Sequence, residues 1–298
     1  MGLNDELVRA RNVAVDPLKP ENWKDVLRRV DSETPEDVAH RGLKRAEEAL
    51  RVIEEYTRAY YPQQAEELAK LRYRAYELEQ WLVCVSPAMQ VVRAATVYVL
   101  LTQSLCANGN VLETAKAVLS AGVRLIQLRE KQLADTEVLS LLETLQKMCA
   151  DFGAVLCCND RLDLALLAHC EGVHLGQDDL NPAQARKLSG ERIILGRSTH
   201  SVAQARTAVN EEGADYIAIG SMFETRTKEK PFIAGLKLAE EIAALKLDVP
   251  VFAIGGITVE KIKDLKSVGI RRVAVSQSII GSASPKLEAQ RFLEAMAA

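Results

Sequence analysis

The sequence predicts an α/β protein in which a (β/α)8 TIM barrel follows a small all-α domain, and three observations support this fold class. Short runs rich in β-branched residues recur along the second part of the chain and alternate with amphipathic helical segments. The first part lacks such runs and is rich in Ala, Glu, Leu and Arg, which favour helix. The alternating part holds eight strand-like runs, a number that favours a closed barrel over an open sheet.

The first part of the chain predicts two amphipathic helices. Between residues 35 and 85 the sequence holds almost no glycine. Apolar and small residues recur there every three or four positions, first at Leu43, Ala46, Leu50, Ile53 and Thr57, and then, after a break at Tyr61-Pro62, at Leu68, Leu71, Ala75, Leu78 and Leu82. This spacing places each set on one face of a helix. We expect the two helices to pack as a hairpin with these stripes in its core.

A change of pattern marks the boundary between the two regions. The segment 86–89 interrupts the helical pattern, and short β-branched runs begin beyond Arg93. We therefore predict a helical domain over residues 1–88, a linker over residues 89–95 and the barrel over residues 96–298.

The barrel region divides into strands and helices along its length. The strand-like runs span residues 97–102, 124–129, 154–160, 172–176, 192–198, 215–221, 251–256 and 272–278. The helical segments after the first, second and fifth runs each end in glycine, which can adopt the left-handed conformation that terminates a helix. In such a barrel the chemistry is carried where the strands end. The polar residues that follow each run are therefore the candidate site.

Composition and charge exclude several classes of partner. The formal net charge is -3 with both signs interspersed, so no global field would attract nucleic acid or an anionic membrane. The amino terminus lacks the basic start and apolar stretch of a signal peptide, and no apolar run approaches the length of a membrane span. We expect a cytoplasmic protein. The six cysteines form no CxxC pair, which predicts buried, reduced thiols rather than a metal or redox site.

Two aspartates follow neighbouring strands of the predicted barrel. Asp160 comes at the end of the third run, and Asp179 follows the fourth. Two carboxylates about one strand spacing apart repel each other unless a cation lies between them, and oxygen ligands suit a hard cation such as Mg²⁺. The alternative is that each aspartate caps the helix after it, because aspartate is a favoured N-cap residue.

Basic, hydroxyl and glycine residues follow other strands. Lys131 and Lys228 come after the second and sixth runs, where each can donate to phosphate oxygens, although a single exposed lysine is more often solvated surface. Further donors stand at Ser198, Thr199, Thr225, Arg226 and Thr227, and the pair Gly255 and Gly256 lets backbone N–H groups approach an anion. The combination indicates two phosphate-bearing ligands and a divalent metal.

The four histidines do not form a metal-ligand set. His40, His169 and His174 fall in helical or apolar strand segments, where we expect structural roles. His200 lies on the predicted rim, where it could contact a ligand.

Six short motifs together resemble a known enzyme family. They are QLREK at 127–131, ND at 159–160, GVHLGQDD at 172–179, GRSTH at 196–200, TRTK at 225–228 and AIGGI at 253–257. Their order and approximate spacing resemble those of thiamine-phosphate synthases over residues 96–298. One departure is Ser221, where the family pattern leads us to expect proline.

The resemblance implies a role for each matching residue. The aminopyrimidine diphosphate would be bound by Gln127, Leu128, Arg129, Glu130, Lys131 and Asn159, with Ser198 and Lys228 on its phosphates. Asp160 and Asp179 would hold Mg²⁺ on the pyrophosphate. The thiazole phosphate would contact Thr225, Arg226, Thr227, Gly255 or Gly256, Val275 and Ser276. Lys131, Lys228 and Ser198 would be the catalytic residues of a transferase that forms thiamine phosphate and releases pyrophosphate.

The physical chemistry of the residues agrees with this reaction. A benzylic-type carbon bearing pyrophosphate can ionise if cations neutralise the leaving group and the electron-rich aminopyrimidine supports the charge. The thiazole nitrogen then attacks, so no protein nucleophile is needed. This agrees with the absence of a Ser/His/Asp or Cys/His constellation among the residues on the predicted rim.

The helical region resembles, more faintly, a small domain that is fused to this synthase in some bacteria and also occurs alone. The resemblance lies in RAEEALRVIEEYTR at 45–58 and LRYR at 71–74, and it implies phosphorylation of the aminopyrimidine monophosphate. The segment 40–42 reads His-Arg-Gly where we expect a DAN-like stretch. This departure favours the alternative, a structural or dimerising helical appendage.

Two other functions remain open at this stage. A thiazole tautomerase would use the same barrel without a metal or pyrophosphate site, and the presence of Lys131, Asp160 and Asp179 argues against it. A non-catalytic sensor would bind thiamine phosphates without turnover. We expect small-molecule substrates as partners, and the sequence leaves open whether the chain forms a homo-oligomer.

Overall fold

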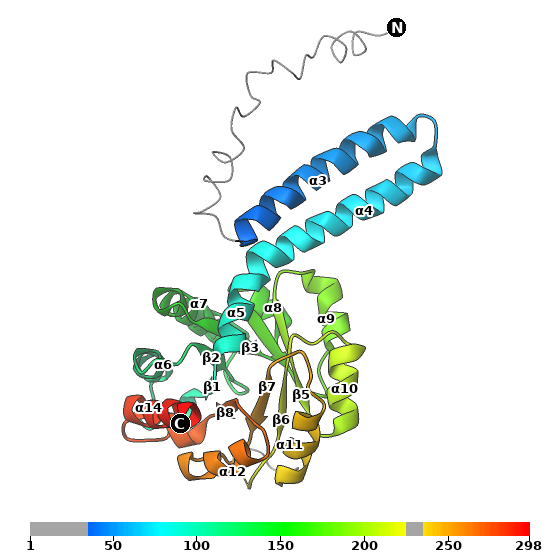
Figure 1. Cartoon of the computed structure of the whole chain (residues 1–298). Coiled ribbons are helices and arrows are strands. Elements are labelled where there is room, and N and C mark those ends of the chain that lie inside the picture. The colour runs from blue at the N-terminus through cyan, green and yellow to red at the C-terminus, as the bar shows by residue number, and fades with distance from the viewer. Residues whose placement is uncertain (1–34, 225–234) are drawn as a thin grey trace, which may run out of the picture. The chain divides into compact units, whose positions relative to one another are not determined.

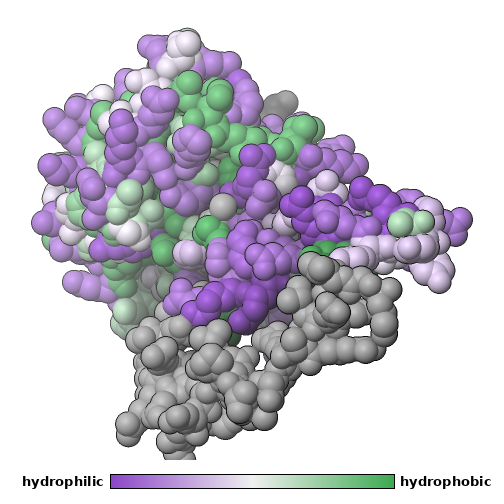
Figure 2. All heavy atoms as spheres, turned by 90° about the horizontal axis from the view of Figure 1, so that it is seen from above, coloured by the Kyte–Doolittle hydropathy of each residue, from purple (hydrophilic) through white to green (hydrophobic). Residues whose placement is uncertain are grey.

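The computed structural model describes residues 35–224 and 235–298 (Figure 1). Contacts within the chain divide it into two compact units, Met1–Tyr76 and Glu77–Ala298. On the face shown in Figure 2, hydrophilic residues cover most of the coloured surface, with smaller hydrophobic patches between them. No helix in the described ranges is both long and apolar enough to cross a membrane.

The first unit contains a helical hairpin, as predicted. Helix α3 spans Pro35–Arg58, and α4 begins at Pro62 and runs to Gln80 in the second unit. Across the hairpin, Arg72 Nε lies 2.9 Å from Glu54 Oε2, and this hydrogen-bonded guanidinium lowers the pKa of Glu54. The buried ion pair therefore joins the two helices.

The expectation that both apolar stripes form the core of this hairpin holds for Ala75 but is wrong for Ile53 and Leu71. Ile53 is 50% exposed and Leu71 is 57% exposed. Each lies one position before a residue of the ion pair, and one position corresponds to about 100° around a helix. Because the helices meet at Glu54 and Arg72, the preceding apolar side chains face solvent.

The second unit contains a closed barrel of eight parallel strands in sequence order, as predicted. The strands are β1 (Val97–Leu101), β2 (Leu125–Leu128), β3 (Val155–Asn159), β4 (Gly172–Leu175), β5 (Ile194–Thr199), β6 (Tyr216–Gly220), β7 (Val251–Ile254) and β8 (Val273–Val275). The barrel closes where β8 pairs with β1, with Val97 opposite Val273 and Val99 opposite Val275.

Helices connect the strands on the outside of the barrel (Figure 1). The α-helices are α6 (Val111–Ser120), α7 (Asp135–Phe152), α8 (Leu162–Leu167), α9 (Pro182–Ser189), α10 (Val202–Asn210), α11 (Gly235–Ala244), α12 (Ile262–Ser267), α13 (Gln277–Ile280) and α14 (Pro285–Ala297). Two short 3-10 turns, η3 (Gln103–Leu105) and η4 (Val259–Lys261), complete the connections.

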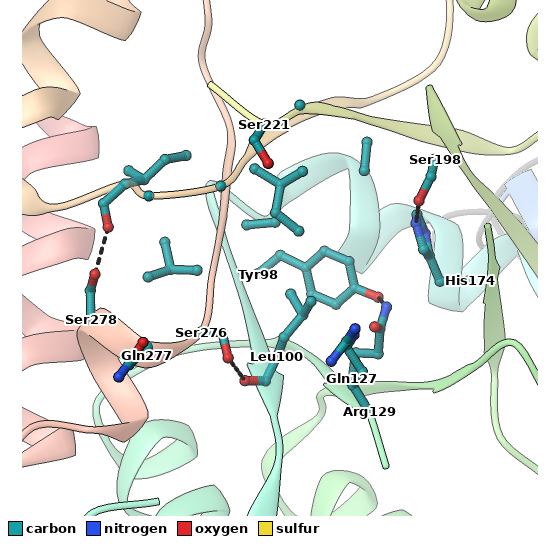
Figure 3. A pocket seen from close by; sticks show the side chains of 18 of the residues that line it. Tyr98, Leu100, Gln127, Arg129, His174, Ser198, Ser221, Ser276, Gln277 and Ser278 are labelled. Atoms are coloured by element: carbon teal, nitrogen blue, oxygen red, sulfur yellow. Dashed lines mark hydrogen bonds between the residues drawn. The ribbon is translucent and has the colours of Figure 1, made fainter. Parts of the chain in front are cut away.

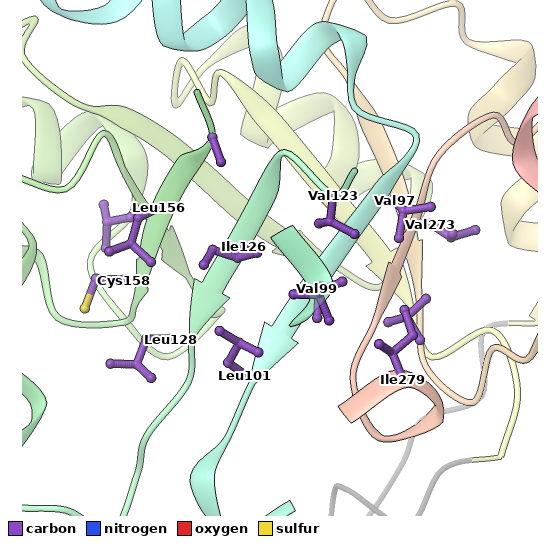
Figure 4. Close-up of a cluster of buried hydrophobic side chains, with 14 of the residues drawn as sticks. Val97, Val99, Leu101, Val123, Ile126, Leu128, Leu156, Cys158, Val273 and Ile279 are labelled. Atoms are coloured by element: carbon purple, nitrogen blue, oxygen red, sulfur yellow. The ribbon is translucent and has the colours of Figure 1, made fainter. Parts of the chain in front are cut away.

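The strands are buried on both faces, which explains their continuous apolar sequences. Successive side chains along a strand point to opposite faces. In β1, Val97, Val99 and Leu101 belong to the core between the strands and the outer helices (Figure 4), whereas Tyr98 and Leu100 belong to the core inside the barrel. The alternation decides which residues of each strand can reach a site within the barrel.

A helix packs against the inner core of the barrel. The chain forms a π-helical turn, η2 (Trp81–Val85), followed by α5 (Ser86–Ala94). Val85, Met89 and Val92 are buried, and they share one apolar cluster with inward-facing residues such as Tyr98 and Phe252. Residues 89–95, which the sequence analysis expects to be a linker, thus lie mostly within a helix that contributes to the barrel core.

Five of the six cysteines agree with the expectation of free, buried thiols, and the side chain of Cys84 lies outside those described. Cys106, Cys149, Cys157, Cys158 and Cys170 are all free and buried. Burial raises the pKa of the Cys157 thiol to about 11 and that of Cys158 to about 12. At neutral pH these side chains are therefore uncharged.

Candidate functional site

A cavity of about 690 Å³ lies where the strands end at their carboxy-terminal side (Figure 3). Its lining includes many of the residues singled out in the sequence: Gln127, Arg129, Lys131, Asn159, Asp160, Ser198, Gly255, Gly256, Val275 and Ser276. These residues come from strands β2, β3, β5, β7 and β8 or from the loops that follow them. The barrel topology brings them together because the strands are parallel, so that all of their carboxyl ends meet at one rim.

Three described site residues do not line the cavity: Leu128, Glu130 and Asp179, which lies beside the lining residue Asp160. Leu128 is 1% exposed and packs in the outer core, because it follows the inward-facing Gln127 and must point the opposite way. Glu130 accepts a hydrogen bond at Oε1 from the backbone N–H of Gln103 at 2.5 Å, and burial raises its pKa. The structure therefore gives Leu128 a packing contact and Glu130 a bond to the loop after β1.

The remaining predicted residues of this site, Thr225, Arg226, Thr227 and Lys228, lie outside the described residues. Their roles stay predictions that follow from the TRTK motif.

The two aspartates form a close pair with a lysine on the rim. Asp160 has a positive φ of 62°, and its backbone N–H donates to the carbonyl oxygen of His174 at 2.8 Å. Asp179 accepts at Oδ2 from the backbone N–H of Gly176 at 2.7 Å. Burial, together with the hydrogen bond that protonated Asp179 can donate to the Asp160 carboxylate, raises the pKa of Asp179. Lys131 Nζ lies 3.1 Å from Asp160 Oδ2, and its positive charge partly offsets the negative charge of the two carboxylates.

This pair fits a hard cation that also contacts a substrate. The donors are carboxylate oxygens, which Mg²⁺ prefers, and burial and the neighbouring Asp160 carboxylate both raise the pKa of Asp179. Within the described residues, no group of three or more His, Cys, Asp or Glu side chains could hold a metal ion. A cation at this pair would therefore take further oxygen ligands from substrate or water.

Two amide side chains present unpaired polar atoms at the cavity. Gln127 is 1% exposed and Asn159 is 9% exposed. Within the described structure, Gln127 Oε1 and Asn159 Nδ2 are buried and have no hydrogen-bond partner. A buried polar atom without a partner costs about 1–3 kcal/mol. Both residues line the cavity, so a bound heterocycle that reached these atoms could supply the missing partners.

A hydrogen-bonded series of side chains crosses the interior of the barrel, and all its members except Tyr216 line the cavity. Gln127 Nε2 donates to the Tyr98 hydroxyl at 2.6 Å, and that oxygen lies 3.0 Å from the Tyr216 hydroxyl. The Tyr216 oxygen lies 3.1 Å from His174 Nδ1, and His174 Nε2 lies 2.9 Å from Ser198 Oγ. Figure 3 shows the two ends of this series, Gln127 with Tyr98 and His174 with Ser198.

The opposite side of the cavity is built from backbone. Gly255 and Gly256 have positive φ values of 101° and 63°. A Cβ on Gly255 would lie 2.6 Å from Ser221 Cβ, and one on Gly256 would meet the carbonyl oxygen of Glu224. Only glycine fits both the conformation and the space. Lys261 adds a positive charge to this side, with Nζ donating to the Gly256 carbonyl oxygen at 2.8 Å.

Several lining residues were not predicted from the sequence. Tyr98 and His174 fall within strand runs whose neighbours are apolar, and His174 was expected to be structural. Their side chains face inward because they occupy the same phase of the strand as Leu100 and Asn159 do in β1 and β3. His200 does line the cavity, and its Nδ1 donates to the Gly220 carbonyl oxygen at 2.6 Å. The alternation of side chains along each strand was the signal that could have identified Tyr98 and His174 as lining residues.

Comparisons with known proteins show similarity to one enzyme family over most of the chain. A family model described as thiamine monophosphate synthase matches residues 97–279, and a model described as the ThiD2 family matches residues 2–81. The chain is 39% identical to a thiamine-phosphate synthase of a Nostoc species, over 84% of this chain and 69% of that protein. It is 38% identical to a thiamine-phosphate synthase of Parasynechococcus marenigrum, over 97% of this chain and 81% of that protein. A thiamine phosphate pyrophosphorylase structure from Pyrococcus furiosus superposes with a TM-score of 0.62 at 26% identity, over 68% of this chain and 95% of that one.

Proposed function

Since this chain belongs to the thiamine-phosphate synthase family, we propose that its barrel joins an aminopyrimidine diphosphate to a thiazole phosphate within the cavity described above. The chain is an enzyme of thiamine biosynthesis that forms thiamine phosphate. The observation that carries the assignment of the site is the convergence of a charged rim, two unpaired amide atoms and a glycine backbone on one cavity.

The aminopyrimidine ring is proposed to bind at Gln127 and Asn159. An aminopyrimidine carries an amino group that donates and ring nitrogens that accept, and these match the unpaired Gln127 Oε1 and Asn159 Nδ2. Binding would remove the cost of leaving both atoms without partners. This complementarity supports recognition of the pyrimidine at the end of β2 and β3.

The pyrophosphate is proposed to lie at Lys131, Asp160 and Asp179, with Ser198 also on the phosphates. Lys131 places an ammonium group on this rim as a point charge for phosphate oxygens. The two aspartates would hold Mg²⁺, which when bound would offset the negative charge of the leaving group. Lys228 and the TRTK segment belong to this proposal through their motif alone.

The thiazole phosphate is proposed to lie against Gly255, Gly256 and Ser276. Backbone N–H groups next to glycine can approach a phosphate closely. Ser276 Oγ donates to the Leu100 carbonyl oxygen at 3.0 Å, which fixes the start of α13 at this side of the cavity. Val275, at the end of β8, completes this side.

The reaction then needs positioning and charge stabilisation. The bond between the pyrimidine methylene carbon and the pyrophosphate oxygen breaks, and pyrophosphate leaves with the electron pair. The thiazole nitrogen forms the new bond to that carbon. Lys131 stabilises the charge that develops on the leaving group, and the fixed Gln127 and Asn159 hold the ring that supports the cation. Holding both heterocycles in one cavity supplies much of the remaining rate advantage.

The match of residues 2–81 to the ThiD2 family agrees with the fainter resemblance seen in the sequence. For this region we propose phosphorylation of the aminopyrimidine monophosphate, which would supply the diphosphate that the barrel uses. A structural or dimerising role is the alternative outcome.

The test is product formation by the purified full-length chain. Aminopyrimidine diphosphate plus thiazole phosphate should give thiamine phosphate in a Mg²⁺-dependent reaction. The same assay with the monophosphate and ATP tests the helical region. Binding of both substrates without turnover would replace the synthase proposal with a sensor, and isomerisation of the thiazole carboxylate phosphate without condensation would replace it with a tautomerase.

A further inference from the structure

The hydrogen-bonded series inside the barrel connects two proposed ligand contacts on separate strands. Gln127 lies on β2 and Ser198 on β5, and the series between them runs through Tyr98, Tyr216 and His174. Tyr98 is 1% exposed, Tyr216 is fully buried, and His174 is 7% exposed. These groups must therefore satisfy one another rather than bulk water.

The first member fixes the direction of the first hydrogen bond, and the strengths of the available acceptors favour one direction for the others. An amide nitrogen can only donate, so the Tyr98 oxygen accepts from Gln127 Nε2. The single proton of Tyr98 is then available for Tyr216, at 3.0 Å. Burial raises the pKa of both tyrosines, so each hydroxyl keeps its proton.

When Tyr98 donates to Tyr216, the proton of Tyr216 has two possible acceptors. One is His174 Nδ1 at 3.1 Å, and the other is Cys157 Sγ at 3.7 Å. A ring nitrogen is a stronger acceptor than a thiol sulfur. Donation to Nδ1 leaves the proton of neutral His174 on Nε2, which donates to Ser198 Oγ at 2.9 Å. The hydroxyl proton of Ser198 is then free to point into the cavity.

The fold makes room for Tyr216 at a specific place. Gly196, in β5, lies beside the Tyr216 ring, and a Cβ at this position would collide with that ring and its hydroxyl. The rings of Tyr98 and Phe252 pack against Tyr216 edge to face, with centroid distances of 6.0 and 5.8 Å. The ring has little freedom to turn its hydroxyl away from His174.

We propose that Tyr216 is a positioning residue: with Tyr98 it fixes His174 as the Nε2–H tautomer, so that Ser198 donates to the ligand while Gln127 Oε1 accepts from it. The tautomer is independent of the reaction. The consequence for the substrate rests on the proposed function, because Ser198 and Gln127 are both assigned to the aminopyrimidine diphosphate. The series thus orients one donor on β5 and one acceptor on β2 together.

The first test is the tautomer of His174 in the intact chain, which needs no turnover. Two-bond ¹H–¹⁵N correlation spectra of the protein with ¹⁵N-labelled histidine, at a pH of about 8.5, well above the ordinary histidine pKa of about 6.5, distinguish a protonated from an unprotonated ring nitrogen. His174→Gln assigns the signal. We expect an unprotonated Nδ1 and a protonated Nε2. A protonated Nδ1 would reverse the direction of the series and overturn the proposal.

The second test separates positioning from packing. Tyr216→Phe keeps the ring and removes only the hydroxyl, and we expect it to lower kcat/KM for the aminopyrimidine diphosphate by about tenfold, as for the loss of one oriented hydrogen bond. KM for the thiazole phosphate should not change. The matched control is Cys157→Ala, which removes the weaker acceptor of the Tyr216 hydroxyl. It should leave kcat/KM for the aminopyrimidine diphosphate and KM for the thiazole phosphate within about twofold of wild type.

Each outcome of the second test decides between roles. Equal loss of activity toward both substrates, without a change in either KM, would indicate a smaller folded fraction and contradict positioning. An unchanged kcat/KM in Tyr216→Phe would also contradict it. If the wild-type chain forms no product, the proposed function fails, and the spectrum of His174 still decides the direction of the series.

Discussion

At the scale of single residues, the alternating direction of side chains along each strand decides which residues line the cavity and which pack in the outer core. Gln127 and Leu128 are neighbours within one motif, yet Gln127 faces the cavity and Leu128 the outer core. The motif could identify the segment but could not say which of its side chains reach a ligand. Tyr98 and His174 were missed for the same reason, because a polar residue inside an apolar run looks like part of the core until its phase is known.

Replacing Asp179 tests the repulsion in the acid pair. Burial and the neighbouring Asp160 raise the pKa of Asp179 in the folded state. Asp179 therefore contributes fully to the stability of the folded state below its ordinary pKa of 3.8, and this contribution to stability is lost as the pH rises through the raised pKa. At neutral pH without Mg²⁺, Asp179→Asn should therefore raise Tm, by roughly 2–4 °C for each kcal/mol of relieved repulsion. Thermal unfolding of the exposed neighbour variant Asp178→Asn is the control. A lower Tm for Asp179→Asn would contradict the account.

Replacing Asp160 tests the leaving-group site. Asp160→Ala should lower turnover by about tenfold or more and weaken the dependence on Mg²⁺, because the departing pyrophosphate loses part of its charge compensation. Initial rates across a Mg²⁺ titration measure this. Wild-type turnover in this variant would remove Asp160 from the proposed metal site.

Gly196→Ala tests the space reserved for Tyr216. The added methyl would press on the ring, and overpacking of a filled core costs about 1–3 kcal/mol. Denaturant unfolding should show this loss. Gly42→Ala in α3 is the control, since a Cβ there meets nothing within 4 Å and alanine favours helix. If both variants kept wild-type stability, the barrel interior would have space that the structure does not show.

At the scale of elements, the predicted alternation of strands and helices is confirmed, but the role of α5 was not foreseen. Ser86-Pro87 looks like an interruption in the sequence. The structure instead has Pro87 in the first turn of α5, a position where proline loses no helical hydrogen bond. Its apolar face could not be assigned from sequence, because its partners are inward-facing barrel residues far along the chain.

Truncation of a side chain in α5 tests its contribution to the barrel core. Met89 is 6% exposed, and Met89→Ala should destabilise the second unit by about 2 kcal/mol or more. Val83→Ala, at a residue that is 53% exposed, should change stability by less than about 0.5 kcal/mol. Equal unfolding midpoints for the two variants would show that α5 acts only as a linker.

At the scale of the whole molecule, the cavity belongs to one unit. All of its described lining residues lie between Tyr98 and Ser278, within the unit that starts at Glu77. A chain that begins at Glu77 should therefore keep synthase turnover within about twofold of the full-length value. A chain that begins at residue 96 lacks α5 and should lose stability. Loss of synthase activity in the first truncation would show that the barrel needs residues 1–76.

The most direct test of the synthase assignment is the stoichiometry of the full-length reaction. Thiamine phosphate and pyrophosphate should appear in equal amounts, at a rate that depends on Mg²⁺ and on the presence of both the aminopyrimidine diphosphate and the thiazole phosphate. Failure to form thiamine phosphate from these two substrates with Mg²⁺, by a chain shown to be folded, would contradict it.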